Sequence, residues 1–208
     1  MSWFSRPRAD PRAVTVVSGL PRSGTSLMMR MLEAGGLEAV QDGEREADTD
    51  NPGGYYELER VKALDRGDTA WLADAEGKAL KVVSALLTHL PPHRPYDVVF
   101  MSRRIAEVLD SQKRMLRHRD EADAAVDDDE LRRFYHSHLA EVGTWMDTTE
   151  GVRALYVDYG SLVAAPAAGV ARVARFLRRR LDTAAMAGVV DPSLHRNRER
   201  VGARSPLA

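Results

Sequence analysis

Short runs of apolar residues alternate along this sequence with longer amphipathic stretches, and this alternation limits the folds that the chain can adopt. The apolar runs have the length and the β-branched content of buried strands, and they occupy residues 13–17, 80–83, 97–101 and 152–157. Stretches in which apolar residues recur with helical spacing lie between or after most of these runs. Because strands that alternate with helices form parallel βαβ units, the sequence predicts an α/β fold. We expect three layers, with a central, mostly parallel sheet and helices on both faces.

The length of 208 residues suits one domain with short additions. Residues 1–12 are polar and contain two prolines, so we expect a flexible N-terminal arm. Residues 13–190 carry the strand and helix patterns and form one predicted α/β domain. The segment 191–208 contains four arginines and is expected to be a basic C-terminal tail. Within the domain, the polar residues 41–54 predict a long loop, and the spacing over 57–72 predicts one helix.

Composition excludes several classes of protein. The chain has 30 Lys and Arg against 31 Asp and Glu, so its net charge of −1 argues against nucleic acid or a polybasic membrane surface as a partner. Cysteine is absent, which rules out disulfides, thiolate zinc sites and cysteine nucleophiles. The histidines do not have metal-ligand spacing, and we expect His138 to be a half-buried core residue. We see no integral membrane segment and no signal peptide, so we expect a cytoplasmic protein.

The loop after the first predicted strand has the composition of an anion site. It reads Gly19-Leu-Pro-Arg-Ser-Gly-Thr-Ser26 and leads into an amphipathic helix, whose N-terminal N–H groups and dipole attract anions. The spacing of Gly19 and Gly24 matches the start of a P-loop, so we expect a P-loop-like fold. The lysine that a P-loop needs after its second glycine is replaced by Thr25, and the long cation of the loop is Arg22. The sequence therefore predicts a phosphate cradle whose charge is placed differently from that of a nucleoside-triphosphate P-loop.

The same loop resembles that of the sulfotransferases that use 3′-phosphoadenosine 5′-phosphosulfate (PAPS), a family whose loop reads Pro-Lys/Arg-Ser-Gly-Thr-Ser/Thr. Here it stands as Pro21-Arg22-Ser23-Gly24-Thr25-Ser26. The resemblance implies that Arg22 contacts the bridging oxygen and stabilises the leaving phosphate. It also implies that Ser23, Gly24, Thr25 and Ser26 supply amides and hydroxyls to the 5′-phosphosulfate.

Two weaker motifs follow in the order found in that family. An arginine at a strand end and a serine eight residues later bind the 3′-phosphate in the family, and Arg103 and Ser111 have this spacing. The Asn-Pro that often follows the arginine is replaced by Arg104-Ile105. The segment from Tyr156 to Leu162 is similar to a Tyr-Glu-Asp-Leu segment, which implies that Tyr159 lies near the adenine. Tyr159 could equally be a core tyrosine.

The residues that would carry the chemistry are less clearly marked. A base must accept the proton of the attacking hydroxyl, and the Lys-Thr-His motif of cytosolic family members is missing, because Val82 and Val83 follow Lys81. Other branches use a glutamate, and Glu57 is the best candidate because it opens a predicted helix, whose dipole would keep it ionised. Asp50 is the alternative base. Lys81 could neutralise the sulfuryl group, or it could be a strand-edge lysine.

These observations predict a PAPS-dependent sulfotransferase that modifies a hydroxyl or an amine of a small molecule, lipid or glycan by in-line transfer. The family needs no metal. The resemblance covers residues 13–178. Two alternatives remain open, namely a P-loop kinase or nucleotide hydrolase, and a non-catalytic nucleotide-binding module that keeps the fold. The acceptor and the oligomeric state cannot be read from the sequence, and the short chain leaves catalytic competence open.

Overall fold

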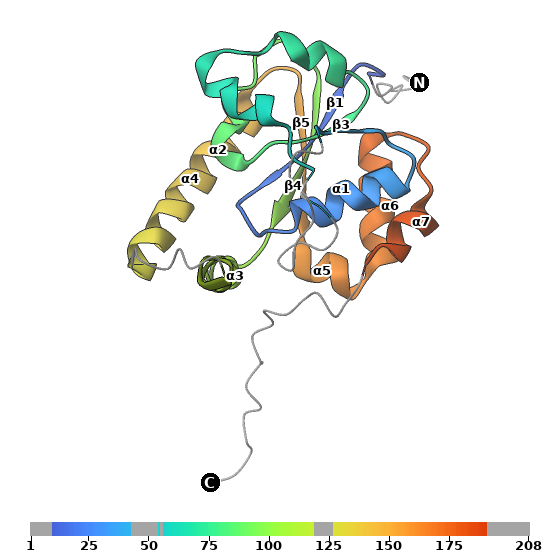
Figure 1. Cartoon of the computed structure of the whole chain (residues 1–208). Coiled ribbons are helices and arrows are strands. Elements are labelled where there is room, and N and C mark those ends of the chain that lie inside the picture. Colours follow the sequence, from blue (N-terminus) through green and yellow to red (C-terminus); the bar gives the residue numbers. More distant parts are fainter. Residues whose placement is uncertain (1–9, 43–53, 55, 119–126, 191–208) are drawn as a thin grey trace, which may run out of the picture.

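The computed structural model describes residues 10–42, 54, 56–118 and 127–190 (Figure 1). The predicted C-terminal tail and Asp50 lie outside the described residues, as does the predicted N-terminal arm except for its last three residues. The described part forms a five-stranded sheet in the order β2-β3-β1-β4-β5. The strands are β1 (Val14–Gly19), β2 (Ala39–Val40), β3 (Ala79–Lys81), β4 (Tyr96–Ser102) and β5 (Val152–Asp158).

Every neighbouring pair in this sheet is parallel, as the sequence predicts. β1 lies in the centre and all six of its residues are buried, which explains its unbroken apolar and β-branched composition. The two-residue strand β2 was not predicted, because a run so short carries no readable periodicity. The predicted strand at 80–83 is displaced by one or two residues, since β3 ends at Lys81 and a new helical turn begins at Ser84.

Helices cover both faces of the sheet, so the predicted three-layer α/β fold is confirmed (Figure 1). One face packs against α1 (Thr25–Ala34), α5 (Tyr159–Ala164), α6 (Pro166–Leu177) and α7 (Thr183–Gly188). The other face packs against the 3₁₀ helices η1 (Glu59–Arg66) and η2 (Ala70–Ala75), and against α2 (Ser84–Leu87) and α4 (Asp128–Thr148). The helix α3 (Ile105–His118) packs against α4 in a smaller third cluster.

The helices largely follow the residues that predicted them. The apolar side of α1 is buried, including Met28 and Leu32, which are fully inaccessible. Asp127 caps α4, since its carboxylate accepts a hydrogen bond from the backbone N–H of Asp129 at 3.1 Å. The single helix predicted over 57–72 is wrong. Two 3₁₀ helices occupy this segment instead, because Gly67 adopts a left-handed conformation and ends the first of them.

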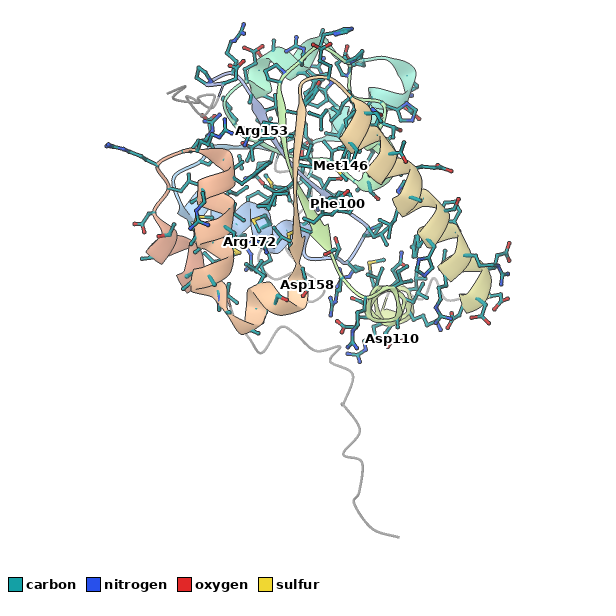
Figure 2. All side chains as sticks on the ribbon, turned by 180° about the vertical axis from the view of Figure 1, so that it is seen from behind. Phe100, Asp110, Met146, Arg153, Asp158 and Arg172 are labelled. Carbon is teal, nitrogen blue, oxygen red and sulfur yellow. The ribbon has the colours of Figure 1, made fainter. Side chains whose placement is uncertain are left out.

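The topology brings several strand ends to one edge of the sheet. In the sheet, β1 lies between β3 on one side and β4 on the other, so the direction in which the chain adds strands reverses at β1. Ligands of open α/β sheets bind at such a reversal, beyond the carboxyl ends of the strands. Figure 2 shows Asp158, at the end of β5, and Asp110, on α3, toward this edge, whereas Arg153 lies toward the opposite edge. No described helix is long and apolar enough to cross a membrane.

Candidate active site

The loop between β1 and α1 contains two positions that need glycine. At Gly19, where φ is +152°, a Cβ atom would lie 2.5 Å from the carbonyl oxygen of Met101 and 2.5 Å from Ser23 Oγ. At Gly24, where φ is +99°, a Cβ atom would lie 2.4 Å from Cδ2 of Tyr159. Side chains at these positions would collide with β4 and α5, and Gly24 also has a backbone conformation that L residues rarely adopt. The glycines therefore let the loop close tightly over the sheet edge.

The start of α1 has the features of an anion-binding site. Gly24 precedes the helix without a side-chain cap, and the first turn contains no acidic residue. The N-terminal N–H groups of a helix need external acceptors, which an anion can supply. The hydroxyl of Ser23 is buried and has no hydrogen-bond partner among the described residues. A buried polar atom without a partner is destabilising unless a ligand or water satisfies it.

Arg22, Ser111 and Arg103, which the sequence assigns to one donor site, lie together in the structure. Arg22 Nε donates a hydrogen bond to Ser111 Oγ at 3.0 Å, and Arg103 Nη1 donates to the carbonyl oxygen of Arg22 at 3.2 Å. Arg22 adopts φ +68°, an uncommon conformation for a residue with a side chain. The loop after β1 and the helix after β4 therefore present two guanidinium groups and a hydroxyl at one place.

Arg103 is held on two sides. Its Nε donates to Glu107 Oε2 at 2.8 Å, and both side chains are more than nine-tenths buried. The guanidinium carbon lies 4.5 Å from the centre of the Tyr159 ring, a cation–π contact. The second oxygen of Glu107 accepts hydrogen bonds from Arg104. Tyr159 is a core residue that supports both Gly24 and Arg103, and its contact with an adenine stays a prediction.

Lys81 belongs to the same site. Its Nζ lies 3.2 Å from Ser26 Oγ, in the first turn of α1, and 3.7 Å from Glu57 Oε1. The side chain of Lys81 is 9% exposed and that of Glu57 is 34% exposed. Of the two expected roles for Lys81, the contact with the anion loop favours the one in the site. The cation is largely enclosed, whereas the carboxylate remains accessible to an approaching molecule.

The expectation that Glu57 opens a helix is wrong. Leu58 is extended and η1 begins at Glu59, so Glu57 lies just outside the helix. Its carbonyl oxygen accepts a hydrogen bond from Asp42 N at 3.3 Å, and the Asp42 carboxylate accepts one from Glu59 N at 2.5 Å. The segment is therefore tied to residue 42 before the helix starts. Lys81, rather than a helix dipole, is the positive charge beside the Glu57 carboxylate.

Two further residues support the site and were not predicted. Tyr56, which adopts φ +53°, donates a hydrogen bond from its hydroxyl to Glu33 Oε2 at 2.5 Å. Burial and this bond raise the pKa of Tyr56 well above its usual range. The bond ties the residue before Glu57 to α1, and no sequence pattern indicates it. Glu107 could have been found, because it lies four residues after Arg103, a spacing that pairs opposite charges along a helix.

In the part of the chain that the structure describes, the side chains that could hold a metal do not gather. No group of three or more histidine, aspartate or glutamate side chains among the described residues is arranged to bind a metal ion. His138 is half-buried, as expected, and its Nε2 lies 2.9 Å from Ser84 Oγ. The described site is instead a group of cations around a glycine loop, with Glu57 and Glu107 as its acidic members. Such a site suits a phosphorylated or sulfated ligand.

Two solved structures of sulfotransferase domains have a similar fold. The sulfotransferase domain from the Synechococcus PCC 7002 olefin synthase aligns with a TM-score of 0.53 and 18% identity, covering 93% of this chain and 90% of that domain. The sulfotransferase domain from the curacin biosynthetic pathway aligns with a TM-score of 0.50 and 14% identity, covering 97% and 95%. No protein-family model and no curated protein matches the sequence. The comparison shows that the chain has the fold of sulfotransferase domains, as the resemblance of its loop implies.

Proposed function

We propose that this protein is a PAPS-dependent sulfotransferase that transfers a sulfuryl group to a hydroxyl or an amine of a small molecule, lipid or glycan. One observation carries the proposal: the glycine loop contains Arg22 and a buried Ser23 hydroxyl that has no hydrogen-bond partner in the described part of the chain, and Lys81 and Arg103 both contact this loop. Arginine forks and helix N-termini are the groups that proteins use for phosphate and sulfate. The shared fold of two sulfotransferase domains supports the same conclusion.

The described residues fit the donor in two parts. The loop amides with Ser23, Thr25 and Ser26 would hold the 5′-phosphosulfate at the start of α1. Arg103, kept in place by its buried contacts, would bind the 3′-phosphate together with Ser111. Arg22 belongs to the loop and also contacts both residues of the second part, since its carbonyl oxygen accepts a hydrogen bond from Arg103 and its side chain donates one to Ser111. It would stabilise the negative charge that develops on the leaving phosphate.

The transfer itself needs a base and a charge-stabilising group. The acceptor oxygen attacks sulfur, the bond between sulfur and the bridging oxygen breaks, and 3′-phosphoadenosine 5′-phosphate (PAP) leaves. Glu57 accepts the proton of the acceptor hydroxyl, because it is the accessible carboxylate beside the anion loop. Lys81, 3.7 Å from Glu57 and 3.2 Å from Ser26 Oγ, would neutralise the sulfuryl oxygens during transfer. The reaction requires no metal.

A kinase or nucleotide hydrolase is less well supported. Thr25 stands where such enzymes carry the lysine that reaches the β- and γ-phosphates. Asp158 is the nearest match to a magnesium-binding aspartate at a strand end. Its Oδ1 instead accepts hydrogen bonds from the N–H and hydroxyl of Ser161, at 2.7 and 2.6 Å, and caps α5. A non-catalytic module remains the second candidate, and it differs from an enzyme only in turnover.

Binding of PAP without metal, compared with ATP and magnesium, tests the donor site. We expect calorimetry to show preferential binding of PAP, strongly weakened by Arg103→Ala. Arg94→Ala is the matched control, because Arg94 pairs with Glu76 on the surface and precedes β4 at the opposite edge of the sheet. A preference for ATP with magnesium would refute the sulfotransferase proposal.

Turnover separates the enzyme from a binding module. PAPS hydrolysis and transfer to a panel of alcohols, followed by release of PAP, should fall by at least about a hundredfold in Glu57→Gln, since general bases contribute about 10²–10⁴-fold. PAP binding should change little. Glu59→Gln is the control, because Glu59 pairs with exposed Lys62. Equal PAP release by both variants would exclude Glu57 as the base.

A further inference from the structure

The outer face of α1 carries three polar residues that run away from the anion loop. Ser26, Arg30 and Glu33 are its partly or fully exposed polar positions, whereas residues 27–29 and 31–32 are buried. At about 100° per residue, the three polar positions fall within about 60° of one another around the helix axis. They therefore form one continuous surface, which we call the α1 stripe.

Contacts tie both ends of the α1 stripe to the residues around the proposed base. At the near end, Lys81 Nζ donates a hydrogen bond to Ser26 Oγ at 3.2 Å and lies 3.7 Å from Glu57 Oε1. At the far end, the hydroxyl of Tyr56, which directly precedes Glu57, donates to Glu33 Oε2 at 2.5 Å. The segment that carries the proposed base therefore runs along the stripe, held at its first and last positions.

Arg30 occupies the middle of the α1 stripe. Its Cα lies about 6 Å along the helix axis from that of Ser26, because each of the four residues adds about 1.5 Å. Helical side chains lean toward the N-terminus, so the long side chain of Arg30 covers the turn that contains Ser26. Burial and Glu33 raise the pKa of the Tyr56 hydroxyl, and the positive charge of Arg30 opposes this rise. The Arg30 charge therefore belongs to the surroundings of the proposed base.

The guanidinium of Arg30 lacks an anionic partner in the described part of the chain. Its Nε is buried and has no hydrogen-bond partner among the described residues, with none of whose carboxylates it forms an ion pair. The one carboxylate of α1 is that of Glu33, and its Oε2 accepts the bond from Tyr56 instead. A buried polar atom without a partner calls for a ligand or water, and a guanidinium pairs best with carboxylates and phosphates. Arg30 is therefore a cation that a bound anion can use.

We propose that Arg30 binds an anionic group of the acceptor, so that the acceptor is a hydroxylated acid, with a carboxylate or a phosphate, rather than a neutral alcohol. This inference rests on the proposed sulfotransferase function. With its hydroxyl at Glu57, such an acceptor would lay its acidic group along the α1 stripe against Arg30. Lys81 is the cation that contacts the anion loop itself, so it serves the sulfuryl group, whereas Arg30 begins one turn further along α1.

Binding of acceptors that differ in charge tests this proposal. Calorimetry on the PAP-saturated protein would compare 3-hydroxybutyrate and 6-hydroxy-2-naphthoate with their methyl esters, and glycerol 3-phosphate with glycerol. PAP fills the anion loop, so the acids must bind elsewhere. We expect the carboxylates, the phosphate or both to bind at least about tenfold more tightly than their neutral partners, because a hydrogen bond between charged groups is the stronger one.

Variants of the α1 stripe assign this preference to its residues. Arg30→Gln should bring each acid within about twofold of its neutral partner, and Arg30→Lys should keep part of the preference. Glu33→Gln should increase the preference, because it removes a negative charge one turn from Arg30 and can still accept the bond from Tyr56. Arg66→Gln is the matched control and should change nothing, because Arg66 is an exposed arginine at the end of η1.

The outcomes separate the two proposals. The acidic acceptor would be overturned if no acid binds better than its neutral partner, or if the preference survives in Arg30→Gln. Equal weakening of an acid and its neutral partner in Arg30→Gln would assign Arg30 a structural role and overturn it too. Failure of PAP to bind the unchanged protein would refute the donor site alone. In that case, acid binding without nucleotide that depends on Arg30 and not on Arg103 would support Arg30 as an anion-binding residue.

Discussion

Replacing Glu107 by glutamine separates the charge of this residue from its shape. Glu107 is buried on α3 and accepts hydrogen bonds from two arginines, Arg103 at 2.8 Å and Arg104 at 2.5 Å. Glutamine can keep one hydrogen bond, but it removes the negative charge that both guanidinium groups face. We expect this variant to be less stable and yet to bind PAP more tightly, because the two effects have different physical origins.

The loss of stability follows from the burial of the pair. A hydrogen bond to a charged group contributes about 1.5–3 kcal/mol and a neutral one about 0.5–1.5 kcal/mol, so each bond to Glu107 weakens by about 1–1.5 kcal/mol. Arg104 is 53% exposed, so solvent screens its share. The total is about 1.5–2 kcal/mol. For a chain of this length, that lowers the unfolding temperature by roughly 3–8 °C.

The gain in affinity follows from removed repulsion. An anion bound on the far side of the Arg103 guanidinium would lie roughly 6 Å from the Glu107 carboxylate, where like charges repel by about 3 kcal/mol at an effective dielectric constant of 20. Looser positioning of Arg103 offsets part of this. The contact with Tyr159 remains, so the arginine keeps one support. We expect PAP to bind several-fold more tightly to Glu107→Gln.

Thermal unfolding with and without PAP measures both effects. Without PAP, Glu107→Gln should have a lower unfolding temperature than the unchanged protein. PAP should raise the unfolding temperature of the variant by more than that of the unchanged protein. Glu76→Gln is the control, because Glu76 pairs with Arg94 at 3.1 Å on the surface. Loss of PAP binding in Glu107→Gln would show that orientation outweighs repulsion, and an unchanged unfolding temperature would show that the buried pair contributes nothing.

Three further predictions concern other parts of the structure. Gly24→Ala should lose at least about 2 kcal/mol of stability in urea unfolding, because of the positive φ at this position and a collision with Tyr159. The same variant should lose PAP binding in calorimetry, and full PAP affinity would contradict the tightly closed loop. Tyr56→Phe removes the bond to Glu33, so kcat should fall several-fold while donor affinity stays constant, and a change in donor affinity alone would argue against a positioning role. Burial raises the pKa of Asp97 above 3.8, against the pull of nearby arginines. The folded state therefore holds this proton more tightly than the unfolded chain. The free energy of unfolding of the unchanged protein, relative to that of Asp97→Asn, should fall as pH rises from 3.8 through the raised pKa. An increase in this difference over the same pH range, measured by urea unfolding, would contradict the prediction.

The central part of the fold could be predicted because its signals are local. A buried parallel strand is a continuous apolar run, and an amphipathic helix shows its spacing within a few turns, so β1 and α1 are readable from residues 13–32 alone. The short pieces could not be predicted for the opposite reason. β2 has two residues and α2 has four, and such elements form because neighbouring segments pack on them.

The features of the candidate site likewise divide into those that a local sequence pattern indicates and those that it does not. The loop motif and the Arg103 spacing were visible, because each lies within one stretch of chain. The pairing of Glu57 with Lys81 was not, although both residues were candidates, since it joins residues 24 positions apart through the register of β3. The bond from Tyr56 to Glu33 also crosses the chain, between the segment before η1 and α1. Contacts of this kind depend on the folded arrangement and leave no pattern in one sequence.

The direction of the strands, rather than residue type, separates the arginines that could bind a ligand from those that stabilise the fold. Arg153 pairs with the buried Asp97 at 2.9 Å, across neighbouring positions of β4 and β5 near their amino ends. Arg103 is also paired with an acid and is more deeply buried, its side chain being 8% exposed against 35% for Arg153, but it follows the carboxyl end of β4, where it contacts the glycine loop. In a parallel sheet, only that edge also carries helix N-termini. Arg153 therefore faces an acid and the ring of Phe176, whereas Arg103 faces an acid, the ring of Tyr159 and an anion cradle, and this third neighbour is what makes Arg103 part of the proposed donor site.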